Sequence, residues 1–385
     1  MTDLPRMKIC IDKVDVFVCR APIDTPVRTS FGVMYDRPAV FVQVTDTEGA
    51  VGWGETWCNF PSCGAEHRAR LIETVMVPLL LGRSFDGPSD AFAHLSKTTA
   101  VLALQTGEAG PIAQAISGLD LALWDLCAQR SQKPLWQYLG GASSVVKVYA
   151  SGINPDRPQD IISQCQSEGY NAFKLKIGFG KERDISNLET VRRQFGNDVA
   201  LMVDANQAWT LDEASAMAPY LSEFGLTWLE EPLRTNRPAH EWQALAAMCV
   251  TPLAAGENII GEDDFNDVSR QSSIAVVQPD VAKWGGISGC WPVIQAIQAS
   301  GKLYCPHYLG AGIGLLASAH LLAATGGQGM LEIDANPNPL RSGLAGVLSE
   351  LMNGTADLHE APGVGVPSLL AQDLLPFLVS HSSIH

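Results

Sequence analysis

The sequence predicts an α/β fold in which a (β/α)8 barrel follows an N-terminal α+β domain. From residue 146 onward, short apolar segments alternate with segments of helical composition, which is typical of parallel strands joined by helices. In addition, 26 residues separate Asp204 from Glu230 and 27 separate Glu230 from Glu257, and an apolar run precedes each acid. This step suits one strand, one helix and two loops, which is the repeating unit of such a barrel.

Residues 1–142 show a different pattern, because alternating strands come first and helices follow. The expected elements are antiparallel strand segments at residues 9–19 and 39–54, with a tight turn at 45–51, loops at 25–37 and 55–64, and helices at 66–80 and 111–130. Gly140 and Gly141 then provide a helix stop. We therefore expect residues 1–142 to form an α+β domain.

Residues 143–344 are expected to form the barrel. Its eight candidate strands are residues 146–151, 172–177, 200–204, 227–230, 252–255, 274–278, 303–306 and 330–333, and helices are expected between them, among others at 158–168, 182–195 and 211–224. Thr210 and Glu213 have the spacing of a capping box at the start of the last of these helices. Residues 345–385 are expected to pack back on the first domain.

Composition narrows the class of protein. The chain has 385 residues, 46% of them hydrophobic, and a formal net charge of −15, so it can bury a large core. Without a basic block, a nucleic acid or an anionic membrane surface is not expected as a partner. The sequence shows no signal peptide, and we expect a soluble cytoplasmic protein. Nine cysteines without CxxC spacing fit reduced core residues.

Three carboxylates, those of Asp204, Glu230 and Glu257, each end a predicted strand. Functional side chains of a (β/α)8 barrel gather at the C-terminal ends of its strands, so these acids should meet at one mouth. Carboxylates held that closely raise one another's pKa unless a hard divalent cation neutralises them. The spacing therefore predicts a Mg²⁺ site.

The second barrel strand carries two lysines, Lys174 and Lys176, at alternate positions. Alternate residues of a strand share one face, and here that face should be the barrel interior, because the intervening apolar residues face the helices. Burying a lysine is costly without anionic partners. A desolvated lysine has a lowered pKa, which suits a general base.

Asp280 and His307 follow the sixth and seventh strands, 27 residues apart. Adjacent strand ends are neighbours in space, and a carboxylate beside an imidazole fixes its tautomer and raises its basicity. These residues are therefore a candidate acid/base dyad. Glu332, 25 residues beyond His307, ends the eighth strand at the same mouth.

Taken in order, these residues resemble the enolase superfamily, mandelate racemase branch. The barrel motifs are Lys174-x-Lys176, Asp204, Glu230-Glu231-Pro232, Gly256-Glu257-Asn258, Pro279-Asp280, Lys283-x-Gly285-Gly286, His307 and Glu332. Gly52-Trp53-Gly54-Glu55, Ala122-Leu123-Trp124-Asp125 and Leu139-Gly140-Gly141 resemble the capping domain of that superfamily. The resemblance covers nearly the whole chain. It implies a modified (β/α)8 TIM barrel with an N-terminal α+β capping domain that the C-terminal segment completes.

The resemblance also implies roles for the residues. Asp204, Glu230 and Glu257 match the Mg²⁺ ligands, Lys176 the base on one face of the substrate, and His307 with Asp280 the acid/base on the other. Lys174 and Glu332 match residues that contact the substrate carboxylate, and Asn206 matches a polar substrate contact. The muconate-lactonizing and dipeptide-epimerase branch has a lysine where this chain has Asp280, so the resemblance to that branch is weaker.

The implied chemistry is Mg²⁺-dependent removal of a proton α to a carboxylate, which gives an enediolate. We expect dehydration of an acid sugar, an aldonate or aldarate, to a 2-keto-3-deoxy acid. The alternative is a racemase, epimerase or cycloisomerase of an α-hydroxy acid or sugar lactone, and a more distant one is a metal-binding barrel without activity. The two loops of the first domain offer polar and aromatic groups suited to a polyhydroxy acid, and the candidate substrate contacts are Arg28, Tyr35 and Trp57, with Arg37 and Asn59 beside them. The resemblance further suggests a homo-oligomer, a dimer or an octamer.

Overall fold

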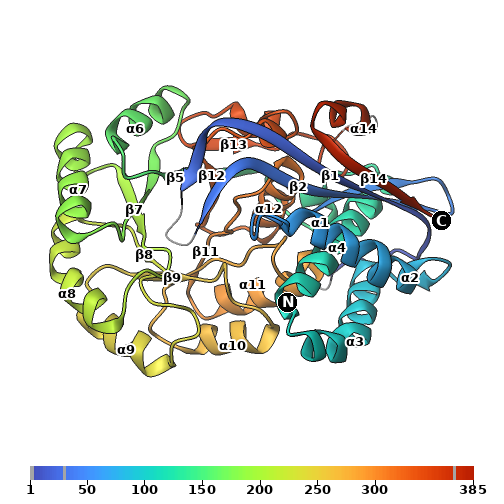
Figure 1. The fold of residues 1–385 in the computed structure, drawn as a ribbon, viewed down its shortest axis with the longest axis horizontal. Helices are drawn as coiled ribbons and strands as arrows, with labels where there is room; N and C mark the ends of the chain where they lie inside the picture. The colour runs from blue at the N-terminus through green and yellow to red at the C-terminus, as the bar shows by residue number, and fades with distance from the viewer. Residues whose placement is uncertain (1–3, 29–31, 367–369) are drawn as a thin grey trace.

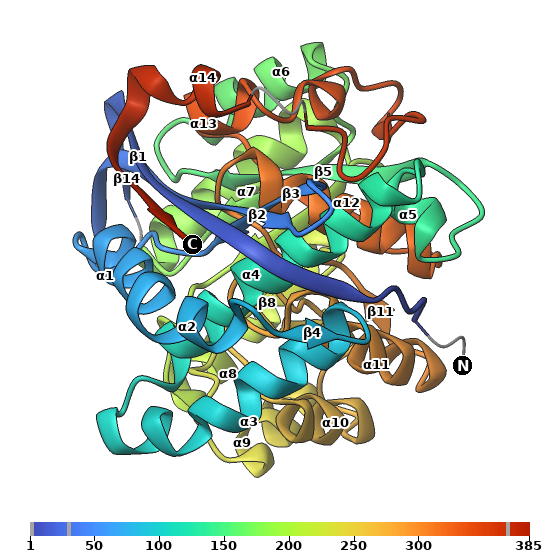
Figure 2. The ribbon, with the colours of Figure 1, turned by 90° about the vertical axis from the view of Figure 1, so that its right-hand side faces the viewer.

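The computed structural model describes residues 4–28, 32–366 and 370–385. Figure 1 shows a barrel ringed by helices on the left and a sheet with its own helices on the right. The strands of this second sheet are β1 (Ile9–Arg28), β2 (Val33–Asp46), β3 (Val51–Thr56), β4 (Ser84–Phe85) and β14 (Leu378–Ile384). Its main order is β14-β1-β2-β3, all antiparallel, and Figure 2 shows β14 lying along β1. The last strand of the chain therefore completes the N-terminal sheet.

The helices of the N-terminal domain pack against this sheet and against the barrel. They are α1 (Gly64–Leu71), the π-helical turn Ile72–Met76, α2 (Val77–Leu80), α3 (Pro88–Thr106), α4 (Ala109–Arg130) and α5 (Leu135–Tyr138). Every residue of α4 from 114 to 128 is buried. This helix lies so close to β3 that a Cβ on Gly54 would be 2.0 Å from the carbonyl oxygen of Gly118. The glycine at this position permits the contact.

Eight parallel strands form the barrel. They are β5 (Val145–Ile153), β6 (Ala172–Lys176), β7 (Ala200–Asp204), β8 (Leu229–Glu230), β9 (Leu253–Ala255), β10 (Val276–Val277), β11 (Leu303–Tyr304) and β12 (Met330–Asp334). Their order is β11-β10-β9-β8-β7-β6-β5-β12. Each lies within or beside a strand expected from the sequence, and the predicted barrel with its N-terminal capping domain is confirmed.

Helices surround the barrel in the expected alternation. They are α6 (Pro158–Ser167), α7 (Lys181–Phe195), α8 (Leu211–Leu221), α9 (Ala239–Met248), α10 (Glu262–Arg270), α11 (Gly286–Ala299) and α12 (Gly312–Thr325). The capping box at Thr210 and Glu213 is present at the start of α8. Inside the barrel, the rings of Tyr149 and Trp228 pack edge to face, with 5.4 Å between their centres. They are part of an apolar cluster beneath the strand ends.

The expected loop at residues 25–37 is wrong for the described residues of this range, and residues 29–31 lie outside them. Strands β1 and β2 remain paired there, with Val27 opposite Met34 and Arg28 opposite Val33. The register is irregular between Pro22 and Val27, which accommodates Pro26, and the two paired strands extend toward the barrel. The expected tight turn at residues 45–51 is present between β2 and β3, which pair antiparallel, whereas helix α3 was not predicted from the sequence.

The C-terminal segment contacts both parts of the molecule. Strand β13 (Thr355–Asp357) pairs antiparallel with β5 of the barrel, whereas β14 pairs with β1. The predicted boundaries at residues 142 and 344 stay predictions. Among the described residues, no helix is both long and apolar enough to cross a membrane, and all nine cysteines are free.

Candidate active site

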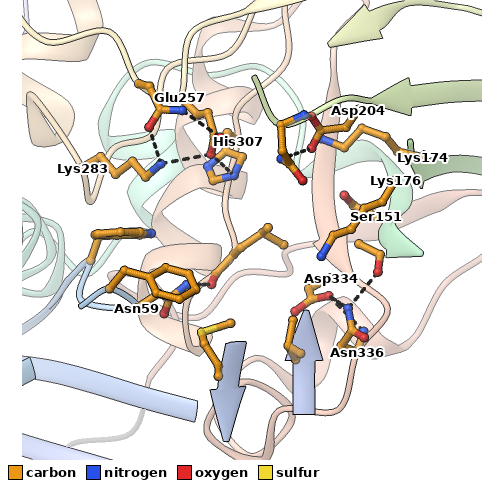
Figure 3. Close-up of a pocket in the computed structure, with 18 of the residues that line it drawn as sticks. Asn59, Ser151, Lys174, Lys176, Asp204, Glu257, Lys283, His307, Asp334 and Asn336 are labelled. Atoms are coloured by element: carbon orange, nitrogen blue, oxygen red, sulfur yellow. Dashed lines mark hydrogen bonds and ion pairs between the residues drawn. The ribbon is translucent and has the colours of Figure 1, made fainter. Parts of the chain in front are cut away.

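A cavity of about 270 Å³ lies where the capping domain covers the C-terminal ends of the barrel strands. Figure 3 shows charged and amide side chains from several strand ends directed into it. Its lining comes from both domains: Val27, Met34, Arg37, Trp57, Asn59 and Phe60 from the capping domain, and Ser151, Gly152, Lys174, Lys176, Asp204, Asn206, Gln207, Glu257, Asn258, Lys283, His307, Leu309, Asp334 and Asn336 from the barrel. Most of the predicted site residues are among them.

Strand register places the first part of the site. Lys176 is opposite Asp204, and Asp204 is opposite Glu230, so three consecutive strands end at the same level. All residues of β6 are buried, including both of its lysines. The expectation that the lysine face points into the barrel therefore agrees with their burial.

Lys174 is held between two carboxylates. Its Nζ lies 2.6 Å from Glu230 Oε1 and 2.7 Å from Glu332 Oε1, and 5.5 Å from the centre of the Tyr149 ring. Burial alone would lower the pKa of Lys174, but the charges of Glu230 and Glu332 raise it well above its ordinary value. Lys174 is therefore a fixed positive charge at the floor of the cavity.

Lys176 has a different environment, although it is only two residues away. Its side chain is 6% exposed, and Figure 3 shows it near Ser151 and Asp334. Burial lowers the pKa of Lys176, and the charges of Arg37 and Lys174 act in the same direction against Asp334 and Asp204. A lysine with a lowered pKa is a better proton acceptor near neutral pH than an exposed one.

His307 is buried between two carboxylates. Its Nδ1 lies 2.7 Å from Asp280 Oδ2, and its Nε2 lies 2.6 Å from Glu257 Oε2. Burial alone would lower the pKa of His307, but the charges of Glu257 and Glu332 and the hydrogen bond to Asp280 raise it well above its ordinary value. These neighbours favour the protonated imidazole, and the predicted contact between Asp280 and His307 is present.

Of the three candidate metal ligands, Asp204 and Glu257 line the cavity and Glu230 does not, and each has its own partner. Glu230 pairs with Lys174, and Glu257 pairs with Lys283 at 3.0 Å. Within the described part of the chain, no three His, Cys, Asp or Glu side chains converge as metal ligands do. The donor chemistry nevertheless fits Mg²⁺, since burial and the charges of Glu230 and Glu257 raise the pKa of Asp204 to about 7, and a divalent cation would remove that repulsion.

Two further charged residues at this wall were not assigned roles from the sequence. Glu231 is 1% exposed and accepts hydrogen bonds from Asn258 Nδ2 at 2.9 and 3.1 Å. Lys283 donates to Glu257 and Asn258, and its Nζ lies 4.8 Å from the centre of the Trp57 ring. The signal available for Lys283 was its spacing of 26 residues from Glu257, the same one-unit step as between the acids.

The predicted substrate contacts of the capping domain have separate outcomes. Trp57, Arg37 and Asn59 line the cavity, whereas Tyr35 is 74% exposed and does not line it. The side chain of Arg28 lies outside the described residues. In the barrel, Asn206 lines the cavity and donates from Nδ2 to Asp204 Oδ2 at 2.6 Å.

Comparison with known protein families agrees with this geometry. Residues 13–140 match the mandelate racemase/muconate lactonizing enzyme N-terminal domain, and residues 160–368 match the enolase C-terminal domain-like family. The chain belongs to the mandelate racemase/muconate lactonizing enzyme family. The predicted membership of the enolase superfamily is thereby confirmed.

Characterised members of this family resemble the chain over most of its length. An arabinonate dehydratase of Saccharolobus solfataricus is 29% identical over 85% of this chain and 87% of its own. A D-galactarolactone cycloisomerase of Agrobacterium fabrum is also 29% identical, over 89% of this chain and 92% of its own. This mandelate racemase/muconate lactonizing enzyme family member is thus an enzyme of the lyase or isomerase type.

Solved structures of the family are also similar. A mandelate racemase/muconate lactonizing enzyme from Bordetella bronchiseptica is 55% identical, with a TM-score of 0.90, over 95% of this chain and 99% of that chain. A racemase from Streptomyces coelicolor with bound magnesium is 27% identical, with a TM-score of 0.84, over 96% of this chain and 100% of that chain.

Proposed function

We propose that this enzyme removes a proton α to a carboxylate, with Mg²⁺ held by Asp204, Glu230 and Glu257, and dehydrates an acid sugar to a 2-keto-3-deoxy acid. The main support is that one cavity holds a buried lysine with a lowered pKa together with a buried histidine paired to an aspartate. Two independent proton-transfer groups suit a reaction that takes a proton from carbon and delivers one to oxygen. The arabinonate dehydratase among its relatives supports an acid sugar as the substrate.

In this proposal Lys174 and Glu332 hold the carboxylate end of the substrate. Lys174 stays protonated, because the two neighbouring acids raise its pKa. As the α-proton leaves, negative charge accumulates on the carboxylate oxygens, and a fixed cation in a buried site stabilises that charge. Mg²⁺, when bound, supplies additional Lewis-acid stabilisation of the same oxygens.

Lys176 and His307 then carry the two proton transfers. The neutral amine of Lys176 takes the α-hydrogen as a proton, and the electron pair of the broken C–H bond stays on the substrate to form the enediolate. The bond from the β-carbon to its hydroxyl breaks, and His307 donates the proton that lets the hydroxyl leave as water. Asp280 stabilises the imidazolium before this transfer and orients the ring. The resulting enol becomes the 2-keto acid.

Isomerisation is the second candidate, because the same two groups can also serve it. If His307 delivered its proton to the α-carbon of the enediolate, the product would be an epimer. If a ring oxygen of the substrate left from the β-carbon, or a substrate hydroxyl added there, the product would be a cycloisomer. The D-galactarolactone cycloisomerase among the relatives supports this alternative. An oligomeric state of two or eight chains stays a prediction.

The test is α-proton exchange followed by ¹H NMR in D₂O with Mg²⁺, on aldonates, aldarates, their lactones and simple α-hydroxy acids. We expect one acid sugar to lose its α-proton signal and form a 2-keto-3-deoxy acid. Lys176→Ala should abolish this exchange, whereas Lys97→Ala, at an exposed position of α3, should not. Exchange without loss of water would favour isomerisation, and absence of exchange on every compound would contradict the proposal.

A further inference from the structure

Arg37 is a buried cation of the cavity that the proposed reaction does not use. It comes from β2 of the capping domain and is 2% exposed, although a guanidinium is rarely buried without full pairing. Its Nη2 lies 2.7 Å from Asp334 Oδ2 on β12 of the barrel. Its Nη1 is buried and has no hydrogen-bond partner among the described residues.

A buried guanidinium nitrogen without an acceptor is energetically unfavourable, because it has lost its hydrogen bonds to water and gained none in the protein. Arg37 lines the cavity in which the substrate would react, so an oxygen of the substrate can supply the missing acceptor. Arg37 comes from β2 of the capping domain. Lys174, which holds the carboxylate end of the substrate in the proposed function, comes from β6 of the barrel. Arg37 is therefore placed to contact the rest of the substrate.

Asp334 determines which kind of oxygen fits beside Arg37. Its Oδ1 accepts hydrogen bonds from Asn336 at 2.7 and 3.0 Å, and its Oδ2 accepts from Arg37. Both Asp334 and Asn336 line the cavity next to Arg37. A hydroxyl group can accept from Arg37 and donate to a carboxylate or amide oxygen at the same time.

A second carboxylate would fit this wall poorly. An added carboxylate beside Arg37 would face the carboxylate of Asp334, whose Oδ2 lies 2.7 Å from Arg37 Nη2 and 3.8 Å from Arg341 Nη1, and Arg341 does not line the cavity. Lys283, another cation among the described lining residues, is paired with Glu257. The remaining lining of the capping domain includes Val27 and Met34, which offer no charge.

We propose that Arg37 and Asp334 form a subsite for a hydroxyl on the distal part of the substrate, so that the enzyme acts on polyhydroxy monocarboxylates in preference to dicarboxylates. This inference rests on the proposed function and narrows its acid sugars from aldonates and aldarates to aldonates.

The experiment measures steady-state kinetics of the full-length Mg²⁺-loaded enzyme on matched pairs that differ only at the terminal carbon: gluconate with glucarate, and galactonate with galactarate. We expect the wild type to show at least roughly 10-fold higher kcat/KM for the preferred aldonate than for its aldarate. Equal or better turnover of the aldarate would overturn the subsite. Absence of α-proton exchange on every acid, glycerate included, would instead overturn the proposed function on which the subsite rests.

Arg37→Lys is the main variant, because lysine keeps the positive charge beside Asp334 and near Lys176 but cannot present two nitrogens to two acceptors. We expect KM for the aldonate to rise roughly 10-fold or more, with kcat changed much less. Exchange of glycerate, which ends at its β-hydroxyl, should be unaffected. An equal loss on glycerate would overturn the proposal, since it would show a general defect.

Two further variants complete the test. Asp334→Asn should lower the ratio of kcat/KM for the aldonate to kcat/KM for the aldarate by roughly 3-fold or more. Because both values are measured on the same variant, an effect of the change on the base Lys176 cancels in this ratio. Arg130→Lys, which alters a capping-domain arginine paired with Asp46 away from the cavity, should leave both KM values unchanged. An unchanged ratio in Asp334→Asn would contradict the assigned role of that carboxylate.

Discussion

Asp280 and His307 lie 2.7 Å apart, Oδ2 to Nδ1, just beyond the ends of the neighbouring strands β10 and β11. A carboxylate that accepts the Nδ1 proton makes Nε2 the atom that exchanges protons with a substrate. Nε2 is on the side of Glu257, whose Oε2 lies 2.6 Å away at the cavity. The pair therefore fixes the orientation of the ring and makes Nε2 the atom that would transfer the proton in the proposed reaction.

Asp280→Asn should lower kcat by roughly 100-fold or more, because an amide neither fixes the tautomer nor stabilises the imidazolium. Exchange of an α-proton on the Lys176 face should persist, since the asparagine leaves that lysine in place. The measurement is ¹H NMR in D₂O on two substrates epimeric at the α-carbon. The double variant with His307→Asn should lose little more than His307→Asn alone, and additive losses would contradict the assigned coupling.

Chelation should abolish exchange, and Mg²⁺ should restore it, because Asp204, Glu230 and Glu257 supply only oxygen ligands. Glu257→Gln should weaken Mg²⁺ binding measured by calorimetry and reduce the rise of Tm that saturating Mg²⁺ produces in the wild type. The matched control is Glu189→Gln, at an exposed position of α7. Full activity in excess EDTA would contradict the metal assignment.

The repeat spacing explains why the barrel and much of its site could be predicted. Each strand of a (β/α)8 barrel ends at the same mouth, so a spacing of 26 or 27 residues between polar positions is enough to bring Asp204 beside Glu230 and Asp280 beside His307. The alternation along one strand likewise placed Lys174 and Lys176 inside. These inferences depend on local register, which the sequence carries directly.

Contacts between the two domains could not be predicted in this way. Arg37 meets Asp334 across 297 residues, and no local pattern encodes that distance. The region around Arg37 was also assigned to a loop, because its prolines and polar residues obscure a strand whose register is irregular. The sequence therefore contains Arg37 and Asp334, but no pattern in it predicts that they pair.

Asp120 of α4 joins the capping domain to the barrel by capping another helix. Its Oδ2 accepts hydrogen bonds from Ile287 N at 2.7 Å and Ser288 N at 3.0 Å, the first residues of α11. Burial raises the pKa of Asp120 to about 7 although these hydrogen bonds oppose the shift. Helix α11 follows the segment that contains Asp280, so this contact also supports the site.

Asp120→Ala should lower the free energy of unfolding by about 2 kcal/mol, since it leaves buried N–H groups of α11 without an acceptor. Asp120→Asn keeps an acceptor and should recover part of the loss. Urea denaturation monitored by circular dichroism measures the change. Asp212→Ala is the control, because Asp212 is an exposed acid in the first turn of α8, and its effect should stay below about 0.5 kcal/mol. An equal effect of both changes would contradict the capping role.

His320 of α12 should make stability fall in mild acid. It is 1% exposed, its Nδ1 accepts from Trp136 N at 3.1 Å, and its ring also hydrogen-bonds the backbone of Val364. Burial lowers the pKa of His320 from 6.5 to about 3, so the folded protein keeps the ring neutral. The unfolded chain binds a proton below pH 6.5. Stability from this residue is therefore present above pH 6.5 and is lost progressively as the pH falls toward 3.

At pH 5.5 this linkage should remove about 1.4 kcal/mol relative to pH 7.5. His320→Gln keeps an acceptor and a donor but does not titrate. Between pH 7.5 and pH 5.5, the unfolding free energy of this variant should therefore fall by about 1.4 kcal/mol less than that of the wild type. Comparing the two proteins at both pH values cancels the other titrating groups, among them Asp120, because they are common to both. Identical pH dependence of wild type and variant would show that His320 is protonated in the folded state or that it is not buried as described.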